Sequence, residues 1–319
     1  MICRAARERS ARLFVLLEVS LISAEEFDAK IIRAVGGIYY VDAHGDPAEE
    51  PLRCAARGIF RRDGISPCAG DNVRVCVQQG AEPVITEIYP RRNYLVRPPL
   101  ANLDGVVFVN SCTQPAPNRF ILDKLTAIAD RAGIEPMMAF TKTDLCGAGE
   151  LPELYGALGI KTCTVDNTTG EGAQQVYDFI AGRTTAFIGN SGVGKSSLLN
   201  VLFPELALET AHISKKLGRG RHTTRQVEMY RLAGGYVADT PGFSTEDTER
   251  YCRISKQELD EAFREFRRYR EKCMFADCAH IKEKGCAVRE AVEQGLIARS
   301  RYDSYLRMYE EASKIKDWE

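Results

Sequence analysis

The sequence predicts a multidomain α/β protein with an additional β-barrel, and three stretches of contrasting pattern predict it. Residues 30–97 consist of short alternating or β-branched runs, separated by turn-rich stretches such as "DAHGDP" and "RRDGIS". From about residue 100, predicted strands and helices alternate, which is typical of a mostly parallel sheet with helices on both faces. From about residue 250 the chain is predicted to be helical and is highly charged. We therefore expect a barrel, a parallel-sheet domain and a helical domain, in that order.

The composition is that of an ordinary soluble protein. The 319 residues suffice for two or three domains, and hydrophobic residues make up 45% and charged residues 27% of the chain. The net charge is only −1, so any binding of nucleic acid must depend on local basic patches. The eleven cysteines are an odd number and do not resemble a disulfide framework, which favours reduced thiols in a reducing compartment.

The N-terminal segment, residues 1–27, is predicted to be an extension. Its apolar run from Leu13 to Ile22 is too short for a membrane helix, contains Glu18 and lacks a clear signal-peptide cleavage site. We interpret this segment as poorly structured, or as the result of a start codon assigned too early. No other segment has the pattern of a membrane span, so we expect a cytoplasmic protein without a membrane partner.

The barrel region has about five short strands within ~70 residues, which suggests an OB-fold, with an SH3-like barrel as the alternative. Arginines mix with aromatic residues in "RGIFRR" and "RRNYLVR" here, and in "FREFRRYREK" further along the chain. Such surfaces can pair with phosphates and stack on bases. Each stretch is also compatible with an amphipathic helix or strand that has one solvated face.

The strongest motif is "GNSGVGKSS", which matches G-x4-G-K-[ST], follows an apolar strand and opens a helix. The glycines let backbone N–H groups curl around phosphates, and the helix N-terminus adds its positive dipole end. We expect Lys195 to bridge the β- and γ-phosphates and the Ser196 hydroxyl to ligate Mg²⁺. The predicted phosphate-binding residues are Gly189, Asn190, Ser191, Gly192, Val193, Gly194, Lys195, Ser196 and Ser197.

Two further stretches have the pattern of nucleotide-sensing switches. "VADTPGF" supplies Asp239, which we expect to hold Mg²⁺ through water, and Gly242, whose N–H would contact the γ-phosphate. "KKLGRGRHTTRQ" contains five basic residues and no acidic one, and either Thr223 or Thr224, preferably Thr224, would close on Mg²⁺. The alternative for this second stretch is a solvated basic loop.

The tetrapeptide "TKTD" follows the apolar strand "MMAF" and is a candidate guanine-reading loop made of Thr141, Lys142, Thr143 and Asp144. The Asp144 carboxylate can accept hydrogen bonds from guanine N1–H and the 2-amino group, which adenine does not offer. The Lys142 stem would pack over the purine. "TTGEG" is a candidate second base-side loop. All parts of a GTPase are then present, but the base loops precede the phosphate loop, which is the order of a circular permutation.

A cysteine cluster lies in the C-terminal region, in the stretch "CMFADCAHIKEKGC". Three thiolates and one imidazole match a closed structural zinc site, which leaves no open position for catalysis. A reduced cluster without metal is the alternative. The candidate zinc ligands are Cys273, Cys278, His280 and Cys286.

The permuted order, the barrel and the cysteine cluster together resemble the RsgA (YjeQ) family, which are circularly permuted GTPases that depend on the small ribosomal subunit. The resemblance covers roughly residues 28–312 and includes "GDNVRV", "PRRNYLVRP", "GNSGVGKSSLLN", "GRGRHTTR" and "DTPGF". It implies GTP and GDP as ligands, one structural Zn²⁺, Mg²⁺ with GTP, and the 30S subunit with its 16S rRNA as partner. The implied domains are an extension (1–27), an OB-fold (28–98), a permuted GTPase domain (99–248) and a helical zinc-binding domain (249–319).

The resemblance also implies which residue assists catalysis, and the chain departs from the family at two places. Phe243 follows the switch glycine and cannot orient water, and the family implies that His222 does so instead. The alternative for His222 is a contact to phosphate or RNA without a catalytic role. The family usually has asparagine where this chain has Thr141, and Ser-Ala where it has Asp166-Asn167.

We therefore expect a monomeric, cytoplasmic GTPase that assists late maturation of the 30S subunit and is stimulated by it. The second hypothesis is an RNA-binding assembly scaffold whose guanine nucleotide is largely structural. A small-molecule P-loop kinase is a third, but "DTPG" together with "TKTD" argues against it.

Overall fold

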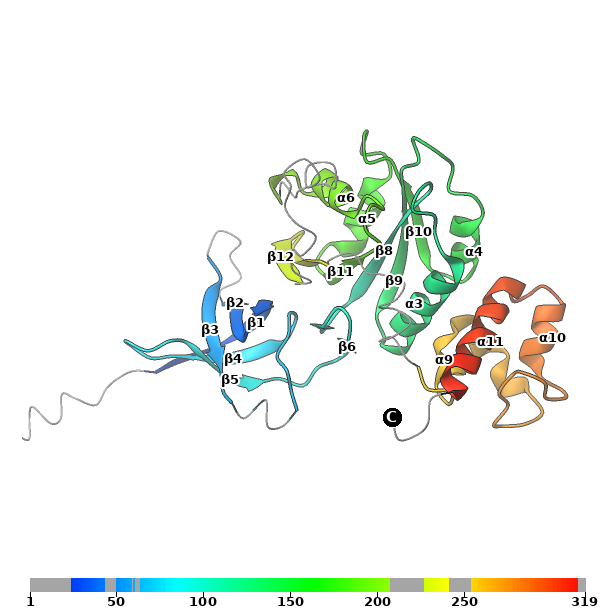
Figure 1. Ribbon diagram of the computed structural model, residues 1–319, viewed down its shortest axis with the longest axis horizontal. Coiled ribbons are helices and arrows are strands. Elements are labelled where there is room, and N and C mark those ends of the chain that lie inside the picture. Colours follow the sequence, from blue (N-terminus) through cyan, green and yellow to red (C-terminus); the bar gives the residue numbers. More distant parts are fainter. Residues whose placement is uncertain are drawn as a thin grey trace, which may run out of the picture. The chain divides into compact units, whose positions relative to one another are not determined.

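The structure is a computed structural model, which describes residues 24–43, 50–58, 60, 64–206, 227–240 and 254–314. The chain divides into two compact units, each with its own core (Figure 1). The first unit contains Met1–Pro67 and Asp71–Pro90, and the second contains Cys68–Gly70 and Arg91–Glu319.

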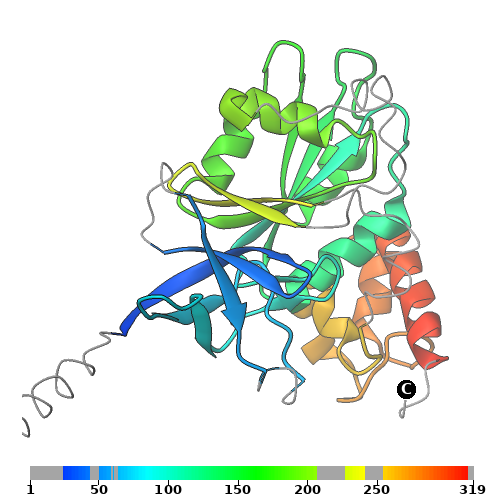
Figure 2. The ribbon, with the colours of Figure 1, turned by 60° about the vertical axis from the view of Figure 1, so that its left-hand side comes forward.

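The first unit is a closed five-stranded barrel, shown by the blue and cyan strands in Figure 2. Strand β1 pairs with both β2 and β4, β2 pairs with β3, and β5 joins β3 to β4, so the ring closes in the order 1-2-3-5-4. This is the five-stranded barrel that the sequence predicts, with OB-like connectivity. The strands are β1 (Glu25–Val35), β2 (Ile38–Asp42), β3 (Leu52–Ala56), β4 (Asn72–Val77) and β5 (Val84–Ile88).

Closure of the barrel depends on its first strand. β1 is eleven residues long, and a register shift between Ile31 and Arg33 bends it so that its two halves serve different neighbours. Alternate residues then point inward, and Ile31, Val73, Val75 and Ile85 are fully buried at the centre. The alternating pattern of the sequence is therefore the inside–outside alternation of a small filled barrel.

The second unit is built on a sheet of five parallel strands, confirming the predicted α/β domain. Their order is β10-β9-β8-β11-β13, and β12 (Glu228–Leu232) joins β13 as an antiparallel edge. The parallel strands are β8 (Gly105–Ser111), β9 (Glu135–Thr141), β10 (Lys161–Val165), β11 (Thr184–Ile188) and β13 (Gly235–Asp239). A separate short ribbon pairs β6 (Tyr94–Leu95) with β7 (Leu100–Ala101).

Helices cover both faces of this sheet (Figure 1). In the central strand β8 every residue is buried, and neighbouring side chains alternate between the faces. Val107 and Val109 point to the face that packs against α5 (Ala173–Ile180) and α6 (Lys195–Leu202). Val106 and Phe108 point to the other face, which is covered by α3 (Arg119–Arg131). The neighbouring α4 (Leu151–Ala157) contacts α3 through a hydrogen bond from Tyr155 to Asp123.

The C-terminal part is helical, as predicted, but its first half is not one long helix. The charged stretch after residue 258 forms the short helix α9 (Leu259–Ala262) and then two 3-10 turns, Arg264–Arg268 and Arg270–Lys272. Phe263 has an extended backbone that separates these elements, and its ring packs with Phe266 and Tyr305. The aromatic residues of "FREFRRYREK" thus build the core with α10 (Ala287–Glu293) and α11 (Arg299–Ser313), and the two phenylalanines have no exposed surface.

Helix α11 packs against α3, where Figure 2 shows the red and teal helices side by side. The contact is centred on Arg301, whose guanidinium is fully buried and donates to Asp123 at 2.8 Å and Thr126 at 3.0 Å. Glu265 accepts a further hydrogen bond from Arg301 at 2.7 Å. Within the described residues, no helix combines the length and apolar character that a membrane span requires.

Candidate functional site

The phosphate loop, the two base-side loops and Asp239 at the end of β13 meet at one edge of the sheet. Because β8, β9, β10, β11 and β13 are parallel, their carboxyl ends share this edge, where open α/β sheets bind ligands. The order of the strands along the chain does not affect this arrangement, so base loops that precede the phosphate loop in sequence still reach the same site.

The phosphate loop spans the six residues between β11 and α6, and steric constraints require glycine at two of its positions. Gly194 is the residue before α6 and has φ 94°, a conformation that other residues rarely adopt. A Cβ at Gly189 would lie 2.6 Å from the Val109 carbonyl oxygen. The loop can therefore pass close to β8 and present backbone N–H groups at the helix N-terminus, which suits a phosphate.

Lys195 and Asp239, predicted for the phosphates and for Mg²⁺, are brought together. Lys195 begins α6 and is largely buried, and its Nζ donates to Asp239 Oδ1 at the end of β13. The two charges compensate each other in a partly buried place, where an isolated charge is costly. A nucleotide phosphate with Mg²⁺ carries both opposite charges, so the pair fits the ligand without leaving either side chain unpaired.

The first base-side loop contacts the phosphate loop directly. Thr141 ends β9 and is fully buried, and its hydroxyl lies within hydrogen-bond distance of the Val193 carbonyl and, at 3.1 Å, of the Asn110 carbonyl. Lys142 has φ 61°, and its ammonium donates to the Gln114 carbonyl at 2.6 Å. Its stem is thereby fixed beside the loop that follows β8.

The residues that would meet the base are less enclosed. Thr143 is half-buried and Asp144 is exposed at the turn beyond β9. An exposed carboxylate is free to accept hydrogen bonds from a purine that enters from solvent.

The second base-side loop is held in shape by Asp166. Its carboxylate accepts from the Thr168 N–H at 2.7 Å and from the Thr169 hydroxyl at 2.9 Å. These hydrogen bonds, with Thr168 the larger cause, lower the pKa of Asp166. Gly172 closes the loop with φ 81°, and a Cβ there would lie 1.9 Å from the Thr164 carbonyl oxygen.

Asn167 lies in the same loop, and sequence reasoning assigned it no role in the site. Its side-chain amide donates to the Gly194 carbonyl at 3.1 Å, so this loop also contacts the phosphate loop. The available signal was the departure from the family's Ser-Ala at this place.

Four predicted site residues lie outside the described residues. They are His222, Thr223 and Thr224 of the basic stretch and Gly242 of the "DTPGF" motif. Their assignments remain predictions.

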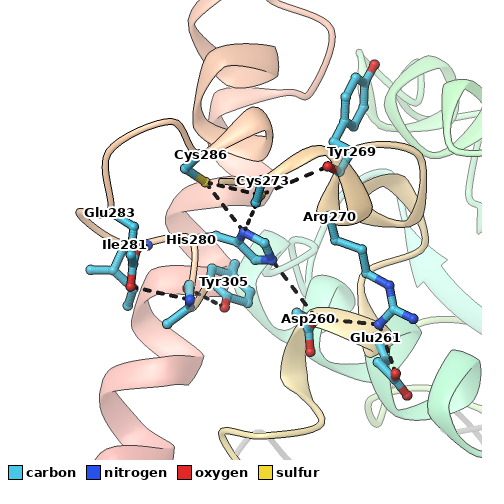
Figure 3. Close-up of polar contacts among 11 residues, drawn as sticks. Asp260, Glu261, Tyr269, Arg270, Cys273, His280, Ile281, Glu283, Cys286 and Tyr305 are labelled. Atoms are coloured by element: carbon cyan, nitrogen blue, oxygen red, sulfur yellow. Dashed lines mark hydrogen bonds and ion pairs between the residues drawn. The ribbon is translucent and has the colours of Figure 1, made fainter. Parts of the chain in front are cut away.

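The four predicted metal ligands form one cluster, of which Figure 3 labels Cys273, His280 and Cys286. Their donor atoms all lie within 4.8 Å of one another. His280 Nδ1 is 3.6 Å from Cys273 Sγ and 3.4 Å from Cys286 Sγ, and the two sulfurs are 4.0 Å apart. Tetrahedral zinc bound by sulfur and nitrogen requires about 3.8 Å between sulfurs and about 3.5 Å between sulfur and nitrogen. The cluster therefore has the donor set and spacing of a closed metal site.

The surroundings orient the imidazole for this role. Figure 3 shows Nδ1 of His280 facing the sulfurs and Nε2 facing Asp260, whose Oδ2 lies 4.0 Å away. Nε2 is buried and has no hydrogen-bond partner among the described residues. A carboxylate behind a histidine ligand is a common support in metal sites. The backbone at His280 is held by Tyr302, which donates to its carbonyl at 2.7 Å.

The electrostatics of the cluster fit metal binding. Burial lowers the pKa of His280, which favours the neutral imidazole that binds metals. Burial raises the pKa of Cys278 to about 12, so a bound cation is needed to keep this thiolate deprotonated. The neighbouring Glu283 carboxylate accepts from the Ile281 N–H at 2.8 Å and the Lys282 N–H at 3.0 Å and fixes the intervening turn.

Comparison with known proteins gives a consistent result over almost the whole chain. The family model described as RsgA GTPase matches residues 88–249, and the model described as RsgA N-terminal domain matches residues 29–85. A protein of Caldanaerobacter subterraneus subsp. tengcongensis, named small ribosomal subunit biogenesis GTPase RsgA, is 42% identical over 91% of this chain and 97% of its own length. A protein of the same name from Bacillus velezensis is 40% identical over 91% of this chain and 98% of its own length.

Two solved structures share the fold. YjeQ from Thermotoga maritima has a TM-score of 0.74 and 30% identity, and covers 92% of this chain and 100% of that one. YloQ, described as a circularly permuted GTPase, has a TM-score of 0.71 and 33% identity, over 92% of this chain and 96% of that one. These matches confirm the predicted order of a barrel followed by a permuted GTPase domain, and the chain belongs to the RsgA GTPase family.

Proposed function

We propose that this protein hydrolyses GTP to GDP and phosphate, binds the 30S ribosomal subunit and assists its late maturation, with hydrolysis stimulated by the subunit. One observation carries the proposal. In a chain of the RsgA family, whose relatives bear the name small ribosomal subunit biogenesis GTPase, a complete phosphate loop is joined to the predicted guanine-reading loop through Thr141. The pair of Lys195 and Asp239 supports nucleotide binding. The scaffold hypothesis also includes a bound nucleotide, so the rate of GTP turnover distinguishes the two hypotheses.

Each part of the proposed site has a distinct role. Lys195 and the N–H groups of the phosphate loop bind the phosphates, and Asp144 accepts hydrogen bonds from guanine. Ser196 and Thr224 bind Mg²⁺, and Asp239 does so through water. A bound Mg²⁺ supplies positive charge that stabilises the transferring phosphoryl group. His222 positions the attacking water, because the residue after Gly242 is a phenylalanine.

The cysteine cluster is proposed to hold one structural Zn²⁺. Cys273, Cys278, His280 and Cys286 would occupy all four tetrahedral positions, which leaves none for substrate. Binding of zinc to such a site contributes on the order of 10–16 kcal/mol in small zinc-dependent domains. The ion would thus stabilise the helical region around α10 and α11 rather than take part in hydrolysis.

The proposal also covers partners and domains. We propose contacts with 16S rRNA through the barrel and the basic stretches, action in the cytoplasm, and a monomeric protein. The proposed functional divisions are the extension (1–27), the OB-fold (28–98), the GTPase domain (99–248) and the zinc-binding domain (249–319).

The test is GTP turnover by the purified protein, alone and with isolated 30S subunits, beside the variants His222→Ala and Lys195→Ala. Strong stimulation that Lys195→Ala abolishes supports the proposal. If His222→Ala keeps the stimulation, the function stands but the role of His222 is wrong. Tight GTP binding without stimulation by 30S subunits would favour the scaffold with a largely structural nucleotide.

A further inference from the structure

Two side chains hold two successive carbonyl groups of the phosphate loop. The Thr141 hydroxyl is bonded to the Val193 carbonyl, and the Asn167 amide donates to the Gly194 carbonyl at 3.1 Å. Thr141 is the last residue of β9 and Asn167 lies in the loop after β10, and both side chains reach the same part of the phosphate loop. A Cβ at Gly194 would lie 2.9 Å from Asn167 Nδ2 and 3.2 Å from Thr141 Oγ1, so a larger residue there would push both away.

Holding these carbonyls also aims the N–H groups that bind phosphate. In a trans peptide, the C=O and N–H of one unit point in opposite directions. The Val193 carbonyl shares its peptide with the Gly194 N–H, and the Gly194 carbonyl shares its peptide with the Lys195 N–H. Fixing both carbonyls toward the base-side loops therefore points these two N–H groups the other way, toward the face where the helix N-terminus receives phosphate.

The contact of Asn167 depends on an amide and not merely on size. The Gly194 carbonyl can only accept, so the group that faces it must be the amide nitrogen. The same carbonyl accepts the first helical bond of α6, from the Leu198 N–H at 2.9 Å. The backbone at Asn167 lies within the turn that Asp166 and Thr168 close by a hydrogen bond. Its other atom, Oδ1, is buried and has no hydrogen-bond partner among the described residues, which simple packing does not explain.

We propose that Asn167 is a positioning residue of the nucleotide site, which shapes the phosphate loop together with Thr141. A threonine hydroxyl has one hydrogen, so Thr141 can donate to only one carbonyl at a time. The Asn167 amide donates the second hydrogen bond, to the Gly194 carbonyl. The pair thus replaces an asparagine at position 141, the residue usual in the family. This inference rests on the proposed function, because it concerns the same nucleotide site.

The experiment measures the Kd of mant-GDP for the full-length protein and for Asn167→Ala, Asn167→Asp and the double variant Thr141→Asn/Asn167→Ala. Loss of one neutral hydrogen bond predicts about two- to tenfold weaker binding by Asn167→Ala. Asn167→Asp should bind more weakly still, because a carboxylate cannot donate and would face a carbonyl oxygen. The double variant should regain affinity, because the asparagine at 141 then supplies the missing amide.

The control Gln175→Ala changes an exposed side chain on α5 and should bind as the unmodified protein does. Competition with GMP separates positioning from general damage. GMP has no β-phosphate for the loop to bind, so Asn167→Ala should weaken the binding of GDP but not that of GMP.

Equal GDP affinity of Asn167→Ala and the unmodified protein would overturn the inference, as would equal losses for GDP and GMP or a double variant no tighter than Asn167→Ala. These results would leave the proposed function intact. Failure of the unmodified protein to bind GDP would instead contradict the proposed function itself.

Discussion

Replacing Arg301 with leucine should strongly destabilise the contact between α3 and α11. The guanidinium is fully buried and donates to Asp123 and Glu265, whose side chains are 0% and 7% exposed. Burial opposes the charged form of Arg301, but Glu265 and Asp123 raise its pKa above the ordinary value, so the group stays charged. A leucine at 301 fills much of the volume but leaves both carboxylates without their cation.

The expected loss of stability follows from the hydrogen bonds that the two carboxylates keep and lose. Asp123 keeps hydrogen bonds from Tyr155 at 2.8 Å and Ser304 at 2.6 Å, whereas Glu265 loses its two bonds to the guanidinium. Breaking one partner of a buried ion pair costs roughly 3–5 kcal/mol, which corresponds to a fall in melting temperature of roughly 6–20 °C.

Urea and thermal unfolding followed by circular dichroism would measure this loss. Arg299→Leu is the matched control, since that arginine is exposed and its pair with Asp303 should be worth less than about 1 kcal/mol. Adding Asp123→Asn and Glu265→Gln to Arg301→Leu should recover part of the stability, because neither position then carries a buried carboxylate without its cation. A cost below about 1 kcal/mol for Arg301→Leu alone would refute this reasoning.

Three further predictions concern the metal cluster, the barrel and the base-side loop. Treatment with a chelator should release one Zn²⁺ per chain and lower the melting temperature. The variant Cys146→Ser, at an exposed cysteine outside the cluster, should contain as much zinc as the unmodified protein. Hydrogen bonds from Tyr89 and then Arg74 lower the pKa of Asp28 below 3.8, so its contribution to stability is complete above that pH and is lost as pH falls through the lowered value. The difference in melting temperature between the protein and Asp28→Asn should therefore shrink below pH 3.8, and a constant difference would contradict this assignment. Gly172→Ala should destabilise the protein and weaken GDP binding more than Gly182→Ala, because both glycines have positive φ but only a Cβ at 172 meets a carbonyl.

The sequence predicted the features that local pattern determines. "GNSGVGKSS" was recognised as a phosphate loop between a strand and a helix, because phosphate binding requires these residue types at consecutive positions. The alternating pattern predicted the barrel, and the alternation of strands and helices predicted a mostly parallel sheet with helices on both faces. "TKTD" could be interpreted as a guanine-reading loop only because it follows an apolar strand and the chain also contains a phosphate loop.

Long-range side-chain pairs could not be predicted in this way. Arg301 and Asp123 are 178 positions apart, and each looks like an ordinary charge on an amphipathic helix. The mixture of arginine and aromatic residues in "FREFRRYREK" suggested an RNA surface, with a solvated helix as the alternative. In the structure Phe263 and Phe266 lie in the core, and Arg264 pairs with Asp130 on α3. Composition alone does not reveal which residues face inward when a stretch folds into 3-10 turns.

Helix α3 connects the nucleotide edge of the sheet to the C-terminal helices. It begins just after the loop whose Gln114 carbonyl accepts from Lys142. Along its length four charged residues pair with the C-terminal segment, and the pairs are Asp123–Arg301, Lys124–Glu311, Asp130–Arg264 and Arg131–Glu258. Sliding α3 past α11 would break buried ion pairs, which is costly, so a change at the nucleotide edge should move the two helices as one body. Hydrogen exchange of α3 and α11 amides should then respond to GTP together, and a response confined to α11 would contradict this coupling.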